Sequence, residues 1–83
     1  MKTQNKDQVT IIKWGASEPG AYATGIFGVY ADYNKAAREL MVARESLVQN
    51  GYTIIKRAEK EVTLKNIEND RTMQLYLESY KIQ

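Results

Sequence analysis

Apolar and polar residues alternate in two stretches near the start of the chain, and a period of two is typical of strands that bury one face. In residues 8–14 the alternation places Val9, Ile11 and Lys13 on one side and Thr10, Ile12 and Trp14 on the other. Residues 15–20 (GASEPG) follow, and their Pro-Gly pair favours a type II turn. We therefore expect a strand followed by a hairpin loop.

Two glycines interrupt the second alternating stretch, residues 22–31. Its period divides the side chains between one face with Tyr22, Thr24, Ile26 and Tyr30 and another with Ala23, Phe27, Val29 and Ala31. Glycine inside a strand usually marks a bulge or a close approach of the backbone, so Gly25 and Gly28 indicate one or the other. Their spacing matches no phosphate-binding motif, and packing is the favoured explanation.

A helical period begins after Asp32, whose side chain is a good acceptor for the free amides of a first helical turn. In residues 33–49 one stripe recurs at three- and four-residue spacing and consists of Ala36, Ala37, Leu40, Met41, Ala43, Leu47 and Val48. This pattern predicts an amphipathic helix that covers a sheet, with Met41 filling the core. Gly51 is expected to end it in the left-handed conformation, with Tyr52 folded back onto Leu47 in a Schellman motif.

Three further strands are predicted at residues 52–57, 62–67 and 72–82, joined by short charged connectors. The last alternates most regularly, with Met73, Leu75 and Leu77 facing one way and Gln74, Tyr76, Glu78 and Tyr80 facing the other. The element order is strand, strand, helix, strand, strand, strand. It predicts an α+β fold in which one helix packs across one face of a single antiparallel sheet of about five strands. We expect residues 1–7 to be a flexible tail and residues 8–83 to form one domain.

Composition argues against most enzyme classes. The 83 residues include no cysteine and no histidine, which excludes thiolate nucleophiles, disulfides and the imidazole group and removes the usual zinc ligands. Ser17 and Ser46 have no candidate base. The carboxylate pairs Glu59/Glu61 and Glu68/Asp70 have the oxygen ligands that Mg²⁺ prefers, but they match no metal-binding motif, and hairpin turns collect charged residues for solubility alone. The sequence predicts no catalytic residue, no metal site and no cofactor.

Charge and hydropathy limit the location and the partners. The longest uncharged apolar run, residues 21–31, is far shorter than the roughly 20 residues of a membrane span, and no signal-peptide pattern is present. We therefore expect a cytoplasmic protein. Twelve Lys and Arg residues against ten Asp and Glu give a net charge of +2, well below the charge of a dedicated duplex binder.

The six tyrosines are the main candidates for binding. The predicted register places Tyr22, Tyr30, Tyr76 and Tyr80 on the sheet face that one helix leaves open, with Lys13, Lys56 and Lys65 nearby. Three explanations remain open for these tyrosines: ordinary half-exposed strand residues, a protein interface, or a platform that stacks single-stranded bases. Trp14, beside the glycine-rich loop, is either an interface anchor or the end of a core.

The segment GIFGVYADYNKAAREL (residues 25–40), followed by GYTI (residues 51–54), resembles small uncharacterised proteins encoded by bacteriophages and prophages. Compact inhibitors of host defence or host metabolism recur among such proteins, so the resemblance implies a host protein as partner but transfers no site residue. The first hypothesis is a non-enzymatic interaction module that docks a host protein through the tyrosine-bearing face or adds a strand to a partner or to its own twin, a homodimer. The alternative is a single-stranded nucleic-acid-binding module that uses the same face.

Overall fold

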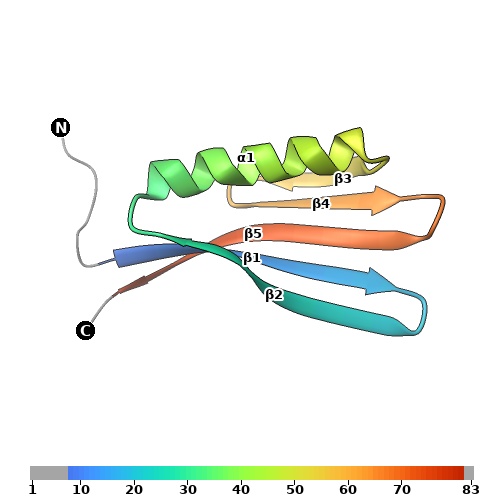
Figure 1. Cartoon of the computed structure of the whole chain (residues 1–83), viewed down its shortest axis with the longest axis horizontal. Helices are drawn as coiled ribbons and strands as arrows, with labels where there is room; N and C mark the ends of the chain where they lie inside the picture. The colour runs from blue at the N-terminus through green and yellow to red at the C-terminus, as the bar shows by residue number, and fades with distance from the viewer. Residues whose placement is uncertain (1–7, 82–83) are drawn as a thin grey trace.

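Five strands form one antiparallel sheet, and a single helix lies along one of its faces (Figure 1). The computed structural model describes residues 8–81. The elements are β1 (Gln8–Glu18), β2 (Ala21–Tyr30), α1 (Tyr33–Gln49), β3 (Thr53–Ala58), β4 (Glu61–Asn66) and β5 (Arg71–Lys81). The sheet order is β2-β1-β5-β4-β3, so β2 and β3 are the two edges. The predicted α+β fold and element order are confirmed, and the predicted tail lies outside the described residues.

The first hairpin is longer than predicted. Residues 15–18 are strand, since Gly15 pairs with Thr24 and Ser17 with Tyr22. Only Pro19 and Gly20 lie outside the ladder, and the φ of Gly20 is +81°. Proline fixes the first central φ and glycine accepts the positive second one, as in a type II turn. Two residues are therefore enough to reverse the chain, and the rest of the expected loop pairs as strand.

Both ends of α1 are capped as predicted. The Asp32 side chain accepts a hydrogen bond from the amide of Asn34 at 2.8 Å. At the other end the Tyr52 amide donates to the carbonyl of Leu47 at 3.0 Å, and the Gly51 amide donates to that of Val48 at 3.1 Å. These two bonds, together with a φ of +96° at Gly51, constitute a Schellman motif.

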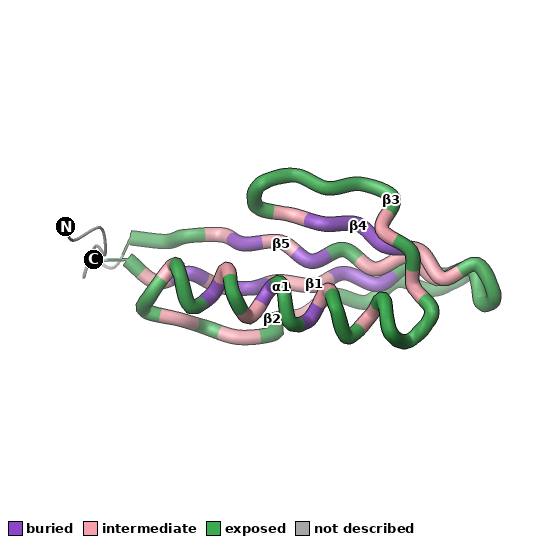
Figure 2. The backbone as a smooth tube through the Cα atoms, turned by 90° about the horizontal axis from the view of Figure 1, so that it is seen from above, coloured by how far each residue is buried: buried purple, intermediate pink, exposed green. Residues whose placement is uncertain are grey.

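The core lies between α1 and the middle of the sheet, where Figure 2 shows buried segments on β1, β5, β4 and the facing side of the helix. Its buried apolar residues are Ile12, Ala16, Ala36, Leu40, Ala43, Val62, Leu64, Leu75 and Leu77. The prediction that Met41 fills the core is wrong, because its side chain is 53% exposed. Only the stripe through Ala36, Leu40 and Ala43 is buried, and Met41, the residue after Leu40, is turned about 100° away from it around the helix axis.

The β4–β5 connection begins earlier than predicted. Ile67 belongs to the turn rather than the strand and is 80% exposed. The side chain of Asn66 accepts a hydrogen bond from the Glu68 amide, and that of Asn69 accepts one from the Arg71 amide, both at 3.0 Å. Asparagine side chains that bond to nearby backbone amides compete with the ladder and favour turns. The strand therefore ends at Asn66.

A β-bulge in β2 changes which residues share a face. Ile12 pairs with Gly28 and the next residue, Lys13, pairs with Ile26, so Phe27 is an extra residue. Because one inserted residue inverts the alternation that follows it, Tyr30 lies on the helix side and packs against the core. The predictions that Tyr30 points away from the helix and that Val29 shares the face of Phe27 are therefore wrong. A bulge is one of the two features that Gly25 and Gly28 predict, and it is confirmed.

The helix-side position of Tyr30 also explains Gly28. A Cβ atom on Gly28 would lie only 2.6 Å from the hydroxyl oxygen of Tyr30 and 2.7 Å from a carbon of its ring. The Tyr30 ring therefore lies over Gly28, an arrangement in which an aromatic residue covers a strand glycine. Close approach, the other expectation for the glycines, holds as well.

Candidate interaction surface

The sheet face opposite α1, which we call the open face, is not covered by the helix. The registers place its side chains in rows across the strands. From β2 to β3 they are Tyr22, Thr24, Ile26, Val29, Val9, Ile11, Lys13, Gly15, Ser17, Thr72, Gln74, Tyr76, Glu78, Tyr80, Glu61, Thr63, Lys65, Thr53, Lys56 and Ala58.

The β2 side of the open face is apolar. Tyr22, Ile26 and Val29 are each more than half exposed. The hydroxyl end of Tyr22 lies over Gly15, where a Cβ atom would be 2.9 Å from its oxygen. Because Gly15 has no side chain, the tyrosine extends across β1 toward Gln74 on β5. This side of the face is an exposed apolar surface in which the Tyr22 ring is held against the backbone at Gly15.

The centre of the open face holds a charged network. The Lys13 ammonium lies 2.6 Å from a carboxylate oxygen of Glu78 and donates to the Tyr80 hydroxyl at 2.9 Å. That hydroxyl donates in turn to Glu78, and the Lys13 nitrogen is 5.5 Å from the centroid of the Tyr80 ring. The hydrogen bonds to Glu78 and Tyr80 raise the pKa of Lys13, and the bonds from Lys13 and Tyr80 lower the pKa of Glu78.

The lowered pKa of Glu78 gives a pH-dependent prediction. Because the unfolded chain binds the proton more readily than the folded one, the stabilisation is complete above the ordinary glutamate pKa of 4.5 and is lost as the pH falls through the folded value. We expect an NMR titration of the Glu78 carboxyl carbon to show a midpoint below 4.5. The Lys13→Met variant removes the hydrogen bond that contributes most to lowering the pKa of Glu78, so its midpoint is expected to move up toward 4.5. An unchanged midpoint would mean that Lys13 does not hold this carboxylate.

The other lysines of the open face are also paired. Lys56 lies 3.5 Å from Glu61, and Lys65 lies 3.2 Å from Asp70. Within the described strands, each lysine on this face therefore has a carboxylate partner within hydrogen-bonding or ion-pair distance. Two of the four acids considered as metal ligands, Glu61 and Asp70, face these lysines. Among residues 8–81, no group of three or more acidic side chains is close enough together to hold a metal ion.

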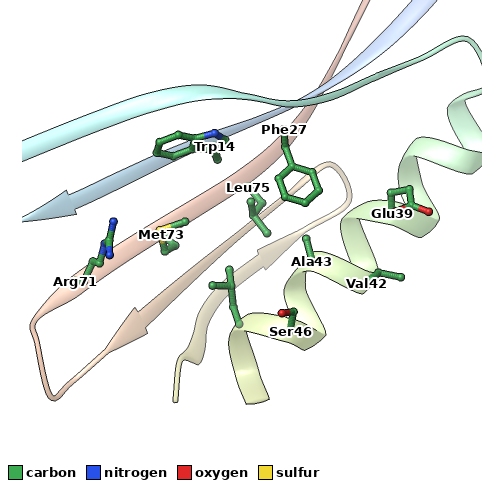
Figure 3. A pocket seen from close by; sticks show the side chains of 10 residues that line it. Trp14, Phe27, Glu39, Val42, Ala43, Ser46, Arg71, Met73 and Leu75 are labelled. Atoms are coloured by element: carbon green, nitrogen blue, oxygen red, sulfur yellow. The ribbon is translucent and has the colours of Figure 1, made fainter. Parts of the chain in front are cut away.

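Trp14 lies on the helix side of the sheet and packs against the core. Its indole lies over Gly25, where a Cβ atom would be 2.9 Å from the ring nitrogen. Figure 3 shows the groove of about 460 Å³ that its side chain helps to line, between β1, β2 and β5 on one side and α1 on the other. Phe27, Met73 and Leu75 contribute from the sheet, and Val42 contributes from the helix.

The structure brings together five of the seven predicted binding residues: Tyr22, Tyr76, Tyr80, Lys56 and Lys65 share the open face. Trp14 and Tyr30 lie on the other side of the sheet. Sequence reasoning missed Val29, which the bulge turns onto the open face. It placed Phe27 on the helix side, where the structure has it, but did not identify it as a residue that lines the groove. The signal that could have found the bulge is the pair Gly25 and Gly28, since each glycine is followed two positions later by an aromatic residue.

Comparison with known proteins gave no match among family models, curated proteins or solved structures. In residues 8–81 no helix combines the length and the apolar character that crossing a membrane requires.

Proposed function

We propose that this chain is a non-enzymatic protein-interaction module that binds another protein through the open face. The observation that carries the proposal is the composition of that face. Exposed aromatic and aliphatic side chains on β2 and tyrosines on β5 share this face, with β1 between the two strands. The lysines between and beyond them are paired with carboxylates. Apolar and aromatic area with a polar surround is the arrangement that protein interfaces use.

The ion pairs favour a protein over a nucleic acid. Binding of single strands depends on cations that are free to neutralise phosphates, and it weakens steeply with salt. Lys13, Lys56 and Lys65 would each have to leave a carboxylate to contact a phosphate. The carboxylates would remain on the same face and repel the backbone of the nucleic acid. Base stacking on the tyrosines would therefore lack the electrostatic attraction that normally accompanies it.

The expected partner presents an apolar patch with hydrogen-bonding groups at its margin. The patch would cover the β2 side of the face, and the polar margin would meet Gln74, Tyr76 and the hydroxyl of Tyr80. The resemblance to phage proteins makes a host protein in the bacterial cytoplasm the first partner to seek, with inhibition as the outcome of binding.

The test is capture of a partner from bacterial lysate, with and without nuclease, by the wild-type chain and by three variants. Tyr76→Ala and Tyr80→Ala change the open face on β5, and Met41→Ala, on the exposed side of α1, is the matched control. We expect one protein to be captured by the wild type and by Met41→Ala despite nuclease, and its recovery to fall at least tenfold with either tyrosine variant. Circular dichroism would confirm that all variants are folded.

Equal recovery with folded tyrosine variants would contradict the use of the open face. Recovery of nucleic acid that nuclease abolishes, without a captured protein, would support the base-stacking alternative instead.

A further inference from the structure

The two edges of the sheet differ in how well they are protected. Natural sheets block exposed edges with charged residues, proline or bulges, because an unprotected edge pairs with other strands. The β3 edge carries Lys56 and Arg57 and a bulge at Ile55. β2 carries neither a charged residue nor a proline over its ten residues, AYATGIFGVY. Its bulge comes late, at Phe27, and leaves Ala21–Ile26 as a regular free edge.

Apolar side chains flank the β2 edge on both faces of the sheet. Ile26 and Val29 stand on the open face and Phe27 on the helix side, and each is more than half exposed. On the helix side the apolar surface continues from Phe27 to Val42 of α1, across the groove. A strand added to this edge would cover side chains on both faces at once.

We propose that a second copy of the chain occupies this edge, so that two β2 strands pair antiparallel about a two-fold axis near Thr24 and form one ten-stranded sheet. β2 is complementary to itself in this register. Tyr22 lies opposite Ile26 on the open face, and Ala23 lies opposite Gly25 on the helix side. Every such pair brings together residues of the same face, as antiparallel pairing requires.

The chemistry of β2 suits pairing with itself. Because β2 carries no charged residue, no like charges face each other when two copies pair. The pairs that form, Tyr22 with Ile26 and Thr24 with Thr24, are aromatic–β-branched and Thr–Thr pairs, which are favourable across antiparallel strands. The Thr24 hydroxyl already donates to the carbonyl of Trp14 at 2.6 Å, so the contact would not leave it without a partner. Many small domains gain stability by self-association because their own cores are limited. Here the core is nine residues, three of them alanine.

The first experiment measures mass by sedimentation equilibrium over a range of micromolar concentrations. The wild type is expected at about 19 kDa, twice the chain mass of 9.5 kDa. Thr24→Lys would place two ammonium groups opposite each other, and we expect it to sediment at 9.5 kDa with an unchanged circular dichroism spectrum. Ile55→Lys, the matched change on the β3 edge, is expected to remain a dimer. A monomeric wild type, or a dimer that only Ile55→Lys dissociates, would overturn the proposal.

A second experiment does not require the lysine variant to fold. The chain contains no cysteine, so a single introduced thiol reports only its own position. Cα atoms of directly opposite antiparallel residues are about 4.5–5.5 Å apart, within the range of roughly 4.4–6.8 Å that disulfides span. Thr24→Cys is expected to form a disulfide-linked dimer under mild oxidation, and Ile55→Cys is expected to stay monomeric on denaturing gels. Equal or reversed yields would overturn the proposal.

Partner binding through the open face and self-association through β2 can be tested independently. Tyr76 and Tyr80 lie on β5, with β1 between them and the β2 edge. Loss of partner capture in their variants therefore leaves the self-association test unaffected, and a monomeric wild type leaves the capture test unaffected.

Discussion

Replacing Leu64 with alanine is expected to lower the free energy of unfolding by about 3 kcal/mol, within the roughly 2–5 kcal/mol range for buried leucine. Leu64 is 0% exposed and lies opposite Ile54 on β3 and Met73 on β5. Its neighbours in the ladder, Ile54 and Met73, are held in paired strands, so they can fill the cavity only in part. The loss would be a large fraction of the stability of a domain of this size.

Urea denaturation followed by Trp14 fluorescence and circular dichroism measures this difference. Val42→Ala is the control, because Val42 is exposed on α1 and its truncation should change stability by no more than about 0.5 kcal/mol. Similar losses for the two variants would show that Leu64 is not at the centre of the core.

Alanine at Gly25 is the second substitution for which we expect a large effect, a loss of about 1–3 kcal/mol. The added Cβ would lie 2.9–3.0 Å from three atoms of the Trp14 indole, which is packed against the core and cannot move away freely. Without this contact the sign should reverse, because glycine inside a strand is about 0.5–1 kcal/mol less favourable than alanine.

Trp14→Leu supplies the background in which the contact is absent. A double-mutant cycle by chemical denaturation, read by circular dichroism, compares Gly25→Ala in the two backgrounds. We expect a loss in the presence of Trp14 and a neutral or slightly favourable effect with leucine. The same loss in both backgrounds would mean that backbone conformation, rather than the indole, requires glycine.

Local signals in the sequence were enough to predict the elements. The cap at Asp32, the stop at Gly51 and the alternation around Leu75 each depend on neighbouring residues alone, and the structure confirms all three. Tyr76 and Tyr80 of β5 are also predicted on the correct face. Simple alternation is enough there, because the pairing of β5 with β1 has no bulge.

The errors arose where a long-range pairing decides the outcome. Whether a glycine-containing strand has a bulge, and at which residue, depends on its register with the neighbouring strand, so Val29 and Tyr30 were assigned to the wrong faces. Met41 fits the helical stripe, but its burial depends on which part of that stripe the sheet contacts, and it is exposed. The strand order could not be predicted from periodicity, and with it the identity of the two edges remained unknown.

The position of β5 has a consequence for how the chain is synthesised. Among residues 8–81, β5 is the strand that hydrogen-bonds to both the β1–β2 hairpin and the β3–β4 hairpin. A hydrogen bond between the hydroxyls of Thr10 and Ser79 joins residues 69 positions apart. On the ribosome the two hairpins and the helix can form early, but the sheet can close only after residue 81 has left the exit tunnel. A chain that stops before residue 71 would lack the centre of its sheet rather than an edge, and its two hairpins would have no strand to join them.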